Sequence, residues 1–103
     1  MKKHLAIFKD RIGELILNGE KVIETRFSIA KIAPYGQVES GDLVYIKPSG
    51  KEIIGQFRVK KVVFIDKANG KYATLIFVGQ TERFLTAPIK IHKKDLRGWV
   101  VLG

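Results

Sequence analysis

The chain has 103 residues, 46% of them hydrophobic and 28% charged, with a net charge of +9, and we expect one folded domain over residues 1–103. It has no cysteine and only two histidines, His4 and His92, so disulfides, thiolate zinc sites and cysteine nucleophiles are excluded, and we expect no metal and no cofactor. No apolar run approaches the roughly 20 residues of a membrane-spanning helix, and the charged start does not resemble a signal peptide, so we expect a cytoplasmic protein without membrane contact.

The first predicted elements are a strand and a helix. Residues 5–8 form a short apolar run typical of a strand. Residues 10–18 repeat apolar side chains every three or four positions, which predicts a helix with one apolar face. We expect Asp10 to cap the start of this helix and Gly19 to end it in the left-handed conformation.

Strands dominate the rest of the chain. The segments 21–27, 42–47, 53–65, 72–78 and 98–103 are rich in strand-forming residues, while 28–40 is irregular. Asn69-Gly70 is the clearest hairpin signal, and the alternation of 53–65 breaks at Lys61, which predicts a bulge. Trp99 is expected to anchor the last strand in the core or at its rim. We therefore predict a mainly β (α+β) fold: a small barrel of five or six mostly antiparallel strands with one or two short helices.

The segment at residues 19–26 reads Gly-Glu-Lys-Val-Ile-Glu-Thr-Arg and alternates acid and base where the helix gives way to a strand. Glu24 and Arg26 lie two apart, so a strand projects them from the same face. Lys21 has the opposite parity but lies at the turn, where its long side chain can swing round to join them. The three would make a site with two cationic donors and one acceptor; the alternative is a surface ion pair with a solvated lysine.

These residues match the G-x-K-x-x-E-x-R signature of the ASCH (activating signal cointegrator homology) family, and the chain resembles that family from about Leu5 to the Trp99 strand. The resemblance implies a PUA-like barrel with a cleft beside the motif, in a family thought to bind RNA or single-stranded nucleic acid. It also implies that Lys21, Glu24 and Arg26 line the cleft, that Gly19 permits the turn, and that Gly41-Asp42 shapes the opposite wall.

The charge distribution favours a nucleic-acid partner. Residues 51–103 carry +7 of the net charge, and a field of that sign attracts phosphate polyanions, although solubility alone would also account for it. An exposed Tyr35 or Tyr45 would stack on a base, whereas a buried one would belong to the core. We expect RNA or single-stranded nucleic acid as the partner and leave the oligomeric state open, a monomer included. The candidate phosphate contacts are Arg58, Lys60, Lys61, Lys93, Lys94 and Arg97.

Two other functions stay open. Some ASCH relatives are hydrolases that act on a modified cytidine with the motif lysine, a threonine and a glutamate on a helical insertion. Lys21 matches the lysine, but Glu24 stands in place of the threonine, Thr25 points to the other strand face, and the short turn at 67–71 replaces the insertion. The resemblance also leaves open a nuclease-like hydrolase that acts on RNA. If the chain is an enzyme of either kind, Lys21 and Glu24 are its candidate catalytic residues. The third possibility is a module that binds a small ligand or a protein.

Overall fold

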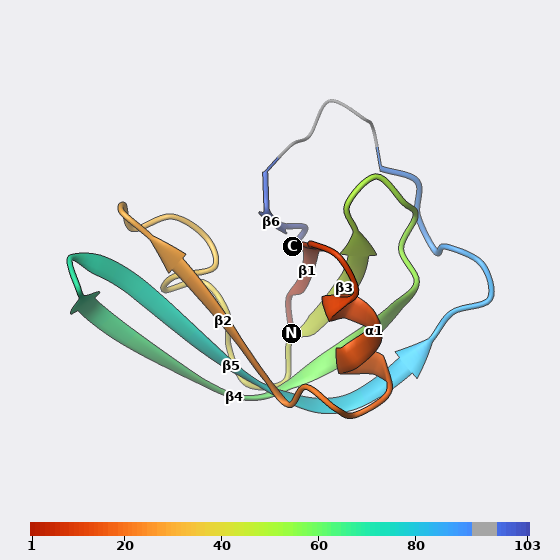
Figure 1. Cartoon of the computed structure of the whole chain (residues 1–103), viewed down its shortest axis with the longest axis horizontal. Coiled ribbons are helices and arrows are strands. Elements are labelled where there is room, and N and C mark those ends of the chain that lie inside the picture. The colour runs from red at the N-terminus through yellow and green to blue at the C-terminus, as the bar shows by residue number, and fades with distance from the viewer. Residues whose placement is uncertain (92–96) are drawn as a thin grey trace.

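A computed structural model describes residues 1–91 and 97–103 (Figure 1). Within them the sheet order is β2-β5-β4-β3-β1-β6, and every neighbouring pair is antiparallel except β1 with β3. The sheet curls strongly into a half-barrel, so the predicted mainly β fold is confirmed, with one of the predicted one or two short helices present in these described residues. No helix in this described part is long and apolar enough to cross a membrane. The elements are β1 (Lys3–Phe8), α1 (Ile12–Leu17), β2 (Ile23–Ser28), β3 (Leu43–Pro48), β4 (Gly55–Ala68), β5 (Lys71–Arg83) and β6 (Trp99–Val101).

The helix α1 is shorter than predicted because its start is not capped as expected. Asp10 lies in the left-handed region with φ of 51°, and Arg11 holds the N-cap position without a side-chain bond. The prediction that Asp10 caps the helix is therefore wrong. The predicted end is confirmed: Gly19 has φ of 85°, and its N–H bonds to the carbonyl of Ile16.

Strands β4 and β5 form a long hairpin whose outer half leaves the core. The predicted turn is confirmed, with Asn69 and Gly70 at φ of 54° and 76°. The register of β4 against β5 shifts between Phe57 and Val59 and again between Val59 and Lys61, which confirms the predicted bulge. Beyond it, residues 61–68 and 71–77 run with β2 as a three-stranded arm, seen at the left of Figure 1.

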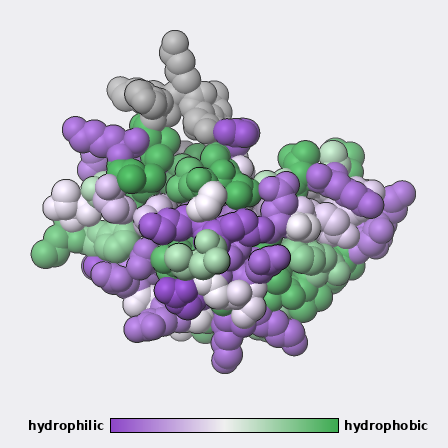
Figure 2. All heavy atoms as spheres, turned by 180° about the vertical axis from the view of Figure 1, so that it is seen from behind, coloured by the Kyte–Doolittle hydropathy of each residue, from purple (hydrophilic) through white to green (hydrophobic). Residues whose placement is uncertain are grey.

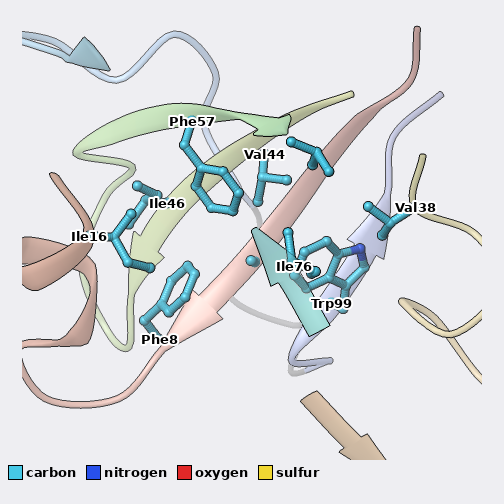
Figure 3. Close-up of a cluster of buried hydrophobic side chains, with 10 residues drawn as sticks. Phe8, Ile16, Val38, Val44, Ile46, Phe57, Ile76 and Trp99 are labelled. Carbon is cyan, nitrogen blue, oxygen red and sulfur yellow. The ribbon is translucent and has the colours of Figure 1, made fainter. Parts of the chain in front are cut away.

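The main core fills the concave side of the sheet (Figure 3). Its buried side chains come from β1, α1, the loop before β3, and strands β3 to β6. Trp99 is 5% exposed, so it is a core residue. The labelled residues of this core are Phe8, Ile16, Val38, Val44, Ile46, Phe57, Ile76 and Trp99.

Two glycines let α1 approach the sheet closely. A Cβ added at Gly13 would lie 2.7 Å from Cγ2 of Ile46, and one added at Gly55 would lie 2.6 Å from the Glu82 carbonyl oxygen and 2.8 Å from Cδ2 of Leu17. Neither position has room for a methyl group. The helix that precedes the motif is therefore seated by these two contacts.

Gly55→Ala should lower the free energy of unfolding by about 1–3 kcal/mol, because the methyl group must displace backbone as well as a side chain. Lys51→Ala, at an exposed position nearby, is the matched control and should change it by less than about 0.5 kcal/mol. Chemical denaturation measures both. Equal stability of the two variants would show that α1 does not pack this closely.

Candidate ligand-binding site

The motif side chains converge at the start of β2. Nζ of Lys21 lies 3.6 Å from Oε1 of Glu24, and Nε of Arg26 lies 3.3 Å from Oε2 of the same carboxylate. The predicted shared face of Glu24 and Arg26 is therefore present, and Lys21 does reach round the turn. Glu24 is only 6% exposed, so its charge is held between two cations rather than in water.

Arg26 also bridges two edges of the curled sheet. From β2, its Nη1 donates to the carbonyl of Gly98 at 3.1 Å, just before β6, and its Nη2 donates to the carbonyl of Ile7 on β1 at 2.9 Å. The guanidinium lies over the rings of Phe8 and Trp99, at 4.8 and 5.4 Å from their centroids. We call this set of contacts the Arg26 bridge. It links β2 to β1 and to the chain entering β6, which are not β2's neighbours in the sheet.

Burial lowers the pKa of the Arg26 guanidinium, and the charge of Glu24 opposes that shift. An arginine titrates so far above neutral pH that Arg26 stays charged. The buried carboxylate thus has a permanent cation beside it. The Glu24–Arg26 pair serves first to hold the sheet. Three nitrogens of Arg26, predicted as donors to a ligand, already have partners within the protein.

A hollow of about 190 Å³ opens beside the Arg26 bridge, between the end of β2, the loop after it, β5 and the chain entering β6. Four of its lining residues are aromatic, and the ring centroids of two of them, Tyr35 and Tyr72, are 5.0 Å apart. Phe64, which does not line the hollow, packs against Tyr35 with ring centroids 5.3 Å apart. Trp99 and Arg26 complete the wall from the core side. The lining residues are Arg26, Phe27, Ser28, Ile32, Ala33, Pro34, Tyr35, Tyr72, Thr74, Gly98 and Trp99.

Only some of the predicted site residues line the hollow. Arg26 and Tyr35 line the hollow, whereas Lys21 and Glu24 lie behind Arg26 and do not. Tyr45 is 8% exposed and packs against Phe84, so it is a core residue and not an exposed platform. Gly19, the first residue of the motif, ends the helix in the left-handed conformation, as predicted.

The predicted phosphate contacts are spread along the surface. Arg58 donates to the carbonyl of Gly41 at 2.7 Å, Lys60 is exposed, and Lys61 lies over the Phe77 ring at 5.4 Å. Arg97 is exposed and directly precedes Gly98 in the wall of the hollow. Lys93 and Lys94, together with His92, lie outside the described residues.

A buried polar network, not foreseen from the sequence, supports the wall of the hollow. Nε1 of Trp99 donates to Nδ1 of His4 at 3.1 Å, and Nε2 of His4 contacts Oδ2 of Asp42 at 2.8 Å. Because an indole N–H only donates, Nδ1 of His4 accepts, so the proton of His4 is on Nε2, which donates a hydrogen bond to Oδ2 of Asp42. Asp42 is 1% exposed and does not line the hollow. The resemblance implied that Gly41-Asp42 shapes a wall of the cleft, but Asp42 instead holds Trp99 in place through His4.

The network sets the ionisation of Asp42. Burial alone would raise the pKa of this carboxyl, but hydrogen bonds from His4 and from the backbone N–H groups of Lys2 and Glu39 outweigh it and lower the pKa. Among the described residues, no group of three or more His, Asp or Glu side chains is placed to hold a metal. His4 and Asp42 are buried and bonded to each other and to Trp99, so the polar cluster supports the fold.

Comparisons with known proteins agree with this architecture. Neither the models of protein families nor the curated proteins gave a match. The solved ASCH structure from Zymomonas mobilis matches 80% of this chain and 70% of its own, with a TM-score of 0.59 at 14% identity. Two single-residue variants of that protein match with TM-scores of 0.60 and 0.62 at 13% identity, over 80% and 81% of this chain and 70% and 73% of theirs. The chain therefore has the ASCH fold, which the motif's resemblance predicted.

Arg26→Ala should cost about 3–5 kcal/mol of unfolding free energy, because it breaks the Arg26 bridge and leaves the Glu24 carboxylate buried without its main partner. Lys21→Ala, which removes the more exposed cation of the same carboxylate, should cost about 1 kcal/mol or less. Denaturant titrations of the two variants make the comparison. Similar, small losses for both would mean that the bridge carries little stability.

Asp42 should make the fold sensitive to acid. Since its folded pKa is lowered from 3.8, the stability it contributes is present above that value and is lost as the pH falls through the folded pKa. We expect the free energy of unfolding, measured from pH 6 to pH 2, to fall below about pH 4 and to fall less steeply in Asp42→Asn.

Glu14→Gln is the matched control for Asp42→Asn. Its carboxylate also has a lowered pKa, through a hydrogen bond from Arg83, but this pair is exposed to solvent and screened by it. The acid profile of Glu14→Gln should follow that of the native chain. A profile of Asp42→Asn that also matches the native one would disprove the role given to Asp42.

Proposed function

We propose that the chain is a binding module for RNA or single-stranded nucleic acid, and that one base enters the hollow beside Arg26. The observation that carries this proposal is an aromatic hollow beside the motif arginine in a strongly basic chain. A base offers a flat ring face for Tyr35 or Tyr72, and its edge would meet Ser28 and the backbone at Gly98. We propose as well that the protein is cytoplasmic and that it binds its nucleic-acid partner without a cofactor.

The size of the hollow limits what enters it. Pockets for drug-sized ligands have roughly 300–1,000 Å³, so about 190 Å³ suits a single ring system. The sugar and phosphate would then remain on the surface. This division favours an oligonucleotide over a free nucleotide, because the backbone has to find its contacts outside the hollow.

The surface charge supplies those contacts. Lys31 is exposed and lies over the ring of the lining residue Tyr72 at 5.5 Å, and Arg97 directly precedes the lining residue Gly98. Arg58 and Lys60 are exposed farther along the chain. Contacts of this kind position a strand without reading its sequence, so we expect weak base preference.

The role of Arg26 in binding is indirect. Its N–H groups bond to Glu24, Gly98 and Ile7, so it supplies positive potential and holds the wall rather than clamping a phosphate. Nothing in the hollow favours hydrolysis over binding: Lys21 and Glu24 lie outside it, and Thr25 pairs on the opposite face of β2. The hydrolase alternative therefore gains no support from the geometry.

Tyr72→Leu should weaken binding of a short single-stranded RNA by about 1–3 kcal/mol, the usual contribution of one stacked base. Tyr35→Leu should do the same. The logarithm of the association constant should also fall linearly with the logarithm of the salt concentration, with a slope of about −0.7 for each phosphate contacted. Fluorescence anisotropy with a labelled oligonucleotide measures both effects.

Leu85→Ala is the control, because that side chain is fully exposed and away from the hollow. It should bind RNA like the native chain. Affinity that is insensitive to salt, or unaffected by both tyrosine replacements, would refute the proposal. A free nucleoside that binds as tightly as the oligonucleotide would point instead to a small-ligand module.

A further inference from the structure

Strand β2 is an edge strand whose outer side is unpaired within the described residues. The N–H of Val78 donates to the carbonyl of Val22, and the register places these two residues opposite each other. Bonded residues alternate along an antiparallel pair, so the backbone groups of Ile23, Thr25 and Phe27 point away from β5. No hydrogen bond from another described residue reaches them.

This edge lacks most of the features that keep natural edges from pairing. Such features are outward lysines, prolines, bulges, very short strands or inward-pointing charges. Of these β2 carries only the inward charges, Glu24 and Arg26, and these two are paired with each other. The outward side chains of β2 are instead Ile23, which is 37% exposed, Thr25, and Phe27, which is 61% exposed. β2 has six residues and no register shift against β5, whereas β6, at the other edge, has only three residues.

Apart from Lys61, which lies over the Phe77 ring, the outer face of the arm is apolar beyond β2 as well. The register sets Thr25 against Leu75 and Ile23 against Phe77 on β5. It then sets Leu75 against Val63 on β4, and Ile65 is 38% exposed farther along the same face. Figure 2 shows hydrophobic side chains gathered on the side of the molecule that carries the arm, at the right of that view. A sheet face of this kind is normally covered by another layer or another chain.

We propose that β2 pairs with β2 of a second copy of this chain, antiparallel, about a two-fold axis at Thr25. The sequence Ile-Glu-Thr-Arg-Phe of residues 23–27 is self-complementary in that arrangement. Ile23 of each copy lies opposite Phe27 of the other, and Glu24 lies opposite Arg26, so no like charges meet next to the axis. The two arms form one continuous sheet with an isologous interface.

A second copy fits this edge better than an unrelated extended peptide, because apolar, acidic, polar, basic and apolar residues follow each other symmetrically about Thr25. The net charge of +9 on each copy opposes association at long range. Salt screens that repulsion, so self-association should strengthen as ionic strength rises. RNA binding has the opposite dependence, and the two processes are therefore distinguishable.

Cysteine cross-linking tests the register directly, because the native chain has no cysteine. Residues paired by both hydrogen bonds have Cα atoms about 5.5 Å apart, which suits a disulfide, so Thr25→Cys should oxidise to a covalent dimer. Phe27→Cys is the matched control: it is more exposed, but its copies would lie about 13 Å apart, four residues along the strand. We expect Thr25→Cys to cross-link at least about tenfold faster, since pairing raises the effective concentration of its thiol.

A mixture of Ile23→Cys and Phe27→Cys tests the same axis from its flanks. The mixture should give a mixed disulfide dimer faster than either variant forms its own. Equal rates for Thr25→Cys and Phe27→Cys, or no mixed product above the level of the separate variants, would overturn the proposal.

Thr25→Lys places a charge on the axis and should abolish dimers in sedimentation at high salt, with the melting temperature of the monomer retained. A Thr25→Lys variant that is still dimeric would overturn the β2 interface. A native chain that sediments as a monomer at every salt and protein concentration tested would overturn the proposal as a whole.

Discussion

The structure depends on one partly buried cation, Arg26, which joins the edge strand β2 to the opposite end of the same sheet. Arg26 leaves β2 beside the Glu24 carboxylate and bonds to carbonyl groups of Ile7 and Gly98, with Phe8 and Trp99 against its plane. A half-barrel lacks the hydrogen bonds that close a full barrel, and a guanidinium with several fixed donors can replace part of that closure. The bridge holds β2 against β1 and the chain entering β6 in the curled sheet.

The hollow is a consequence of the same contact. Arg26 and Gly98 both line it, and Trp99 is held in its wall from below by His4 and Asp42. Two charged networks thus meet at one indole ring, one through its face and the other through its N–H. Arg26 both joins parts of the sheet and lines the hollow, so replacing it affects the fold as well as the hollow. The aromatic side chains on the outer side of the hollow are the better probes of function.

Local patterns predicted most of the fold, whereas contacts between distant segments escaped them. The alternation of Glu24 and Arg26, the Asn69-Gly70 turn and the break at Lys61 are all local, and each was confirmed. The carbonyl partners of Arg26 lie 19 and 72 residues away, and Trp99 lies 95 residues from His4, so neither network could be read from spacing. The burial of Tyr45 depends on Phe84 in the same way. A histidine within an apolar strand, as in residues 4–8, was the one available sign of a buried polar partner.

The central claim is that Arg26 holds the hollow while the tyrosines face the ligand, and NMR of the guanidinium and aromatic groups during an RNA titration tests it most directly. Of the five arginines, Arg26 should show slowly exchanging side-chain N–H signals both before and after RNA is added. The ring signals of Tyr35 and Tyr72 should shift on binding. Rapid exchange of the Arg26 N–H groups in the free protein, or RNA-induced shifts that leave both tyrosines unmoved, would contradict the account.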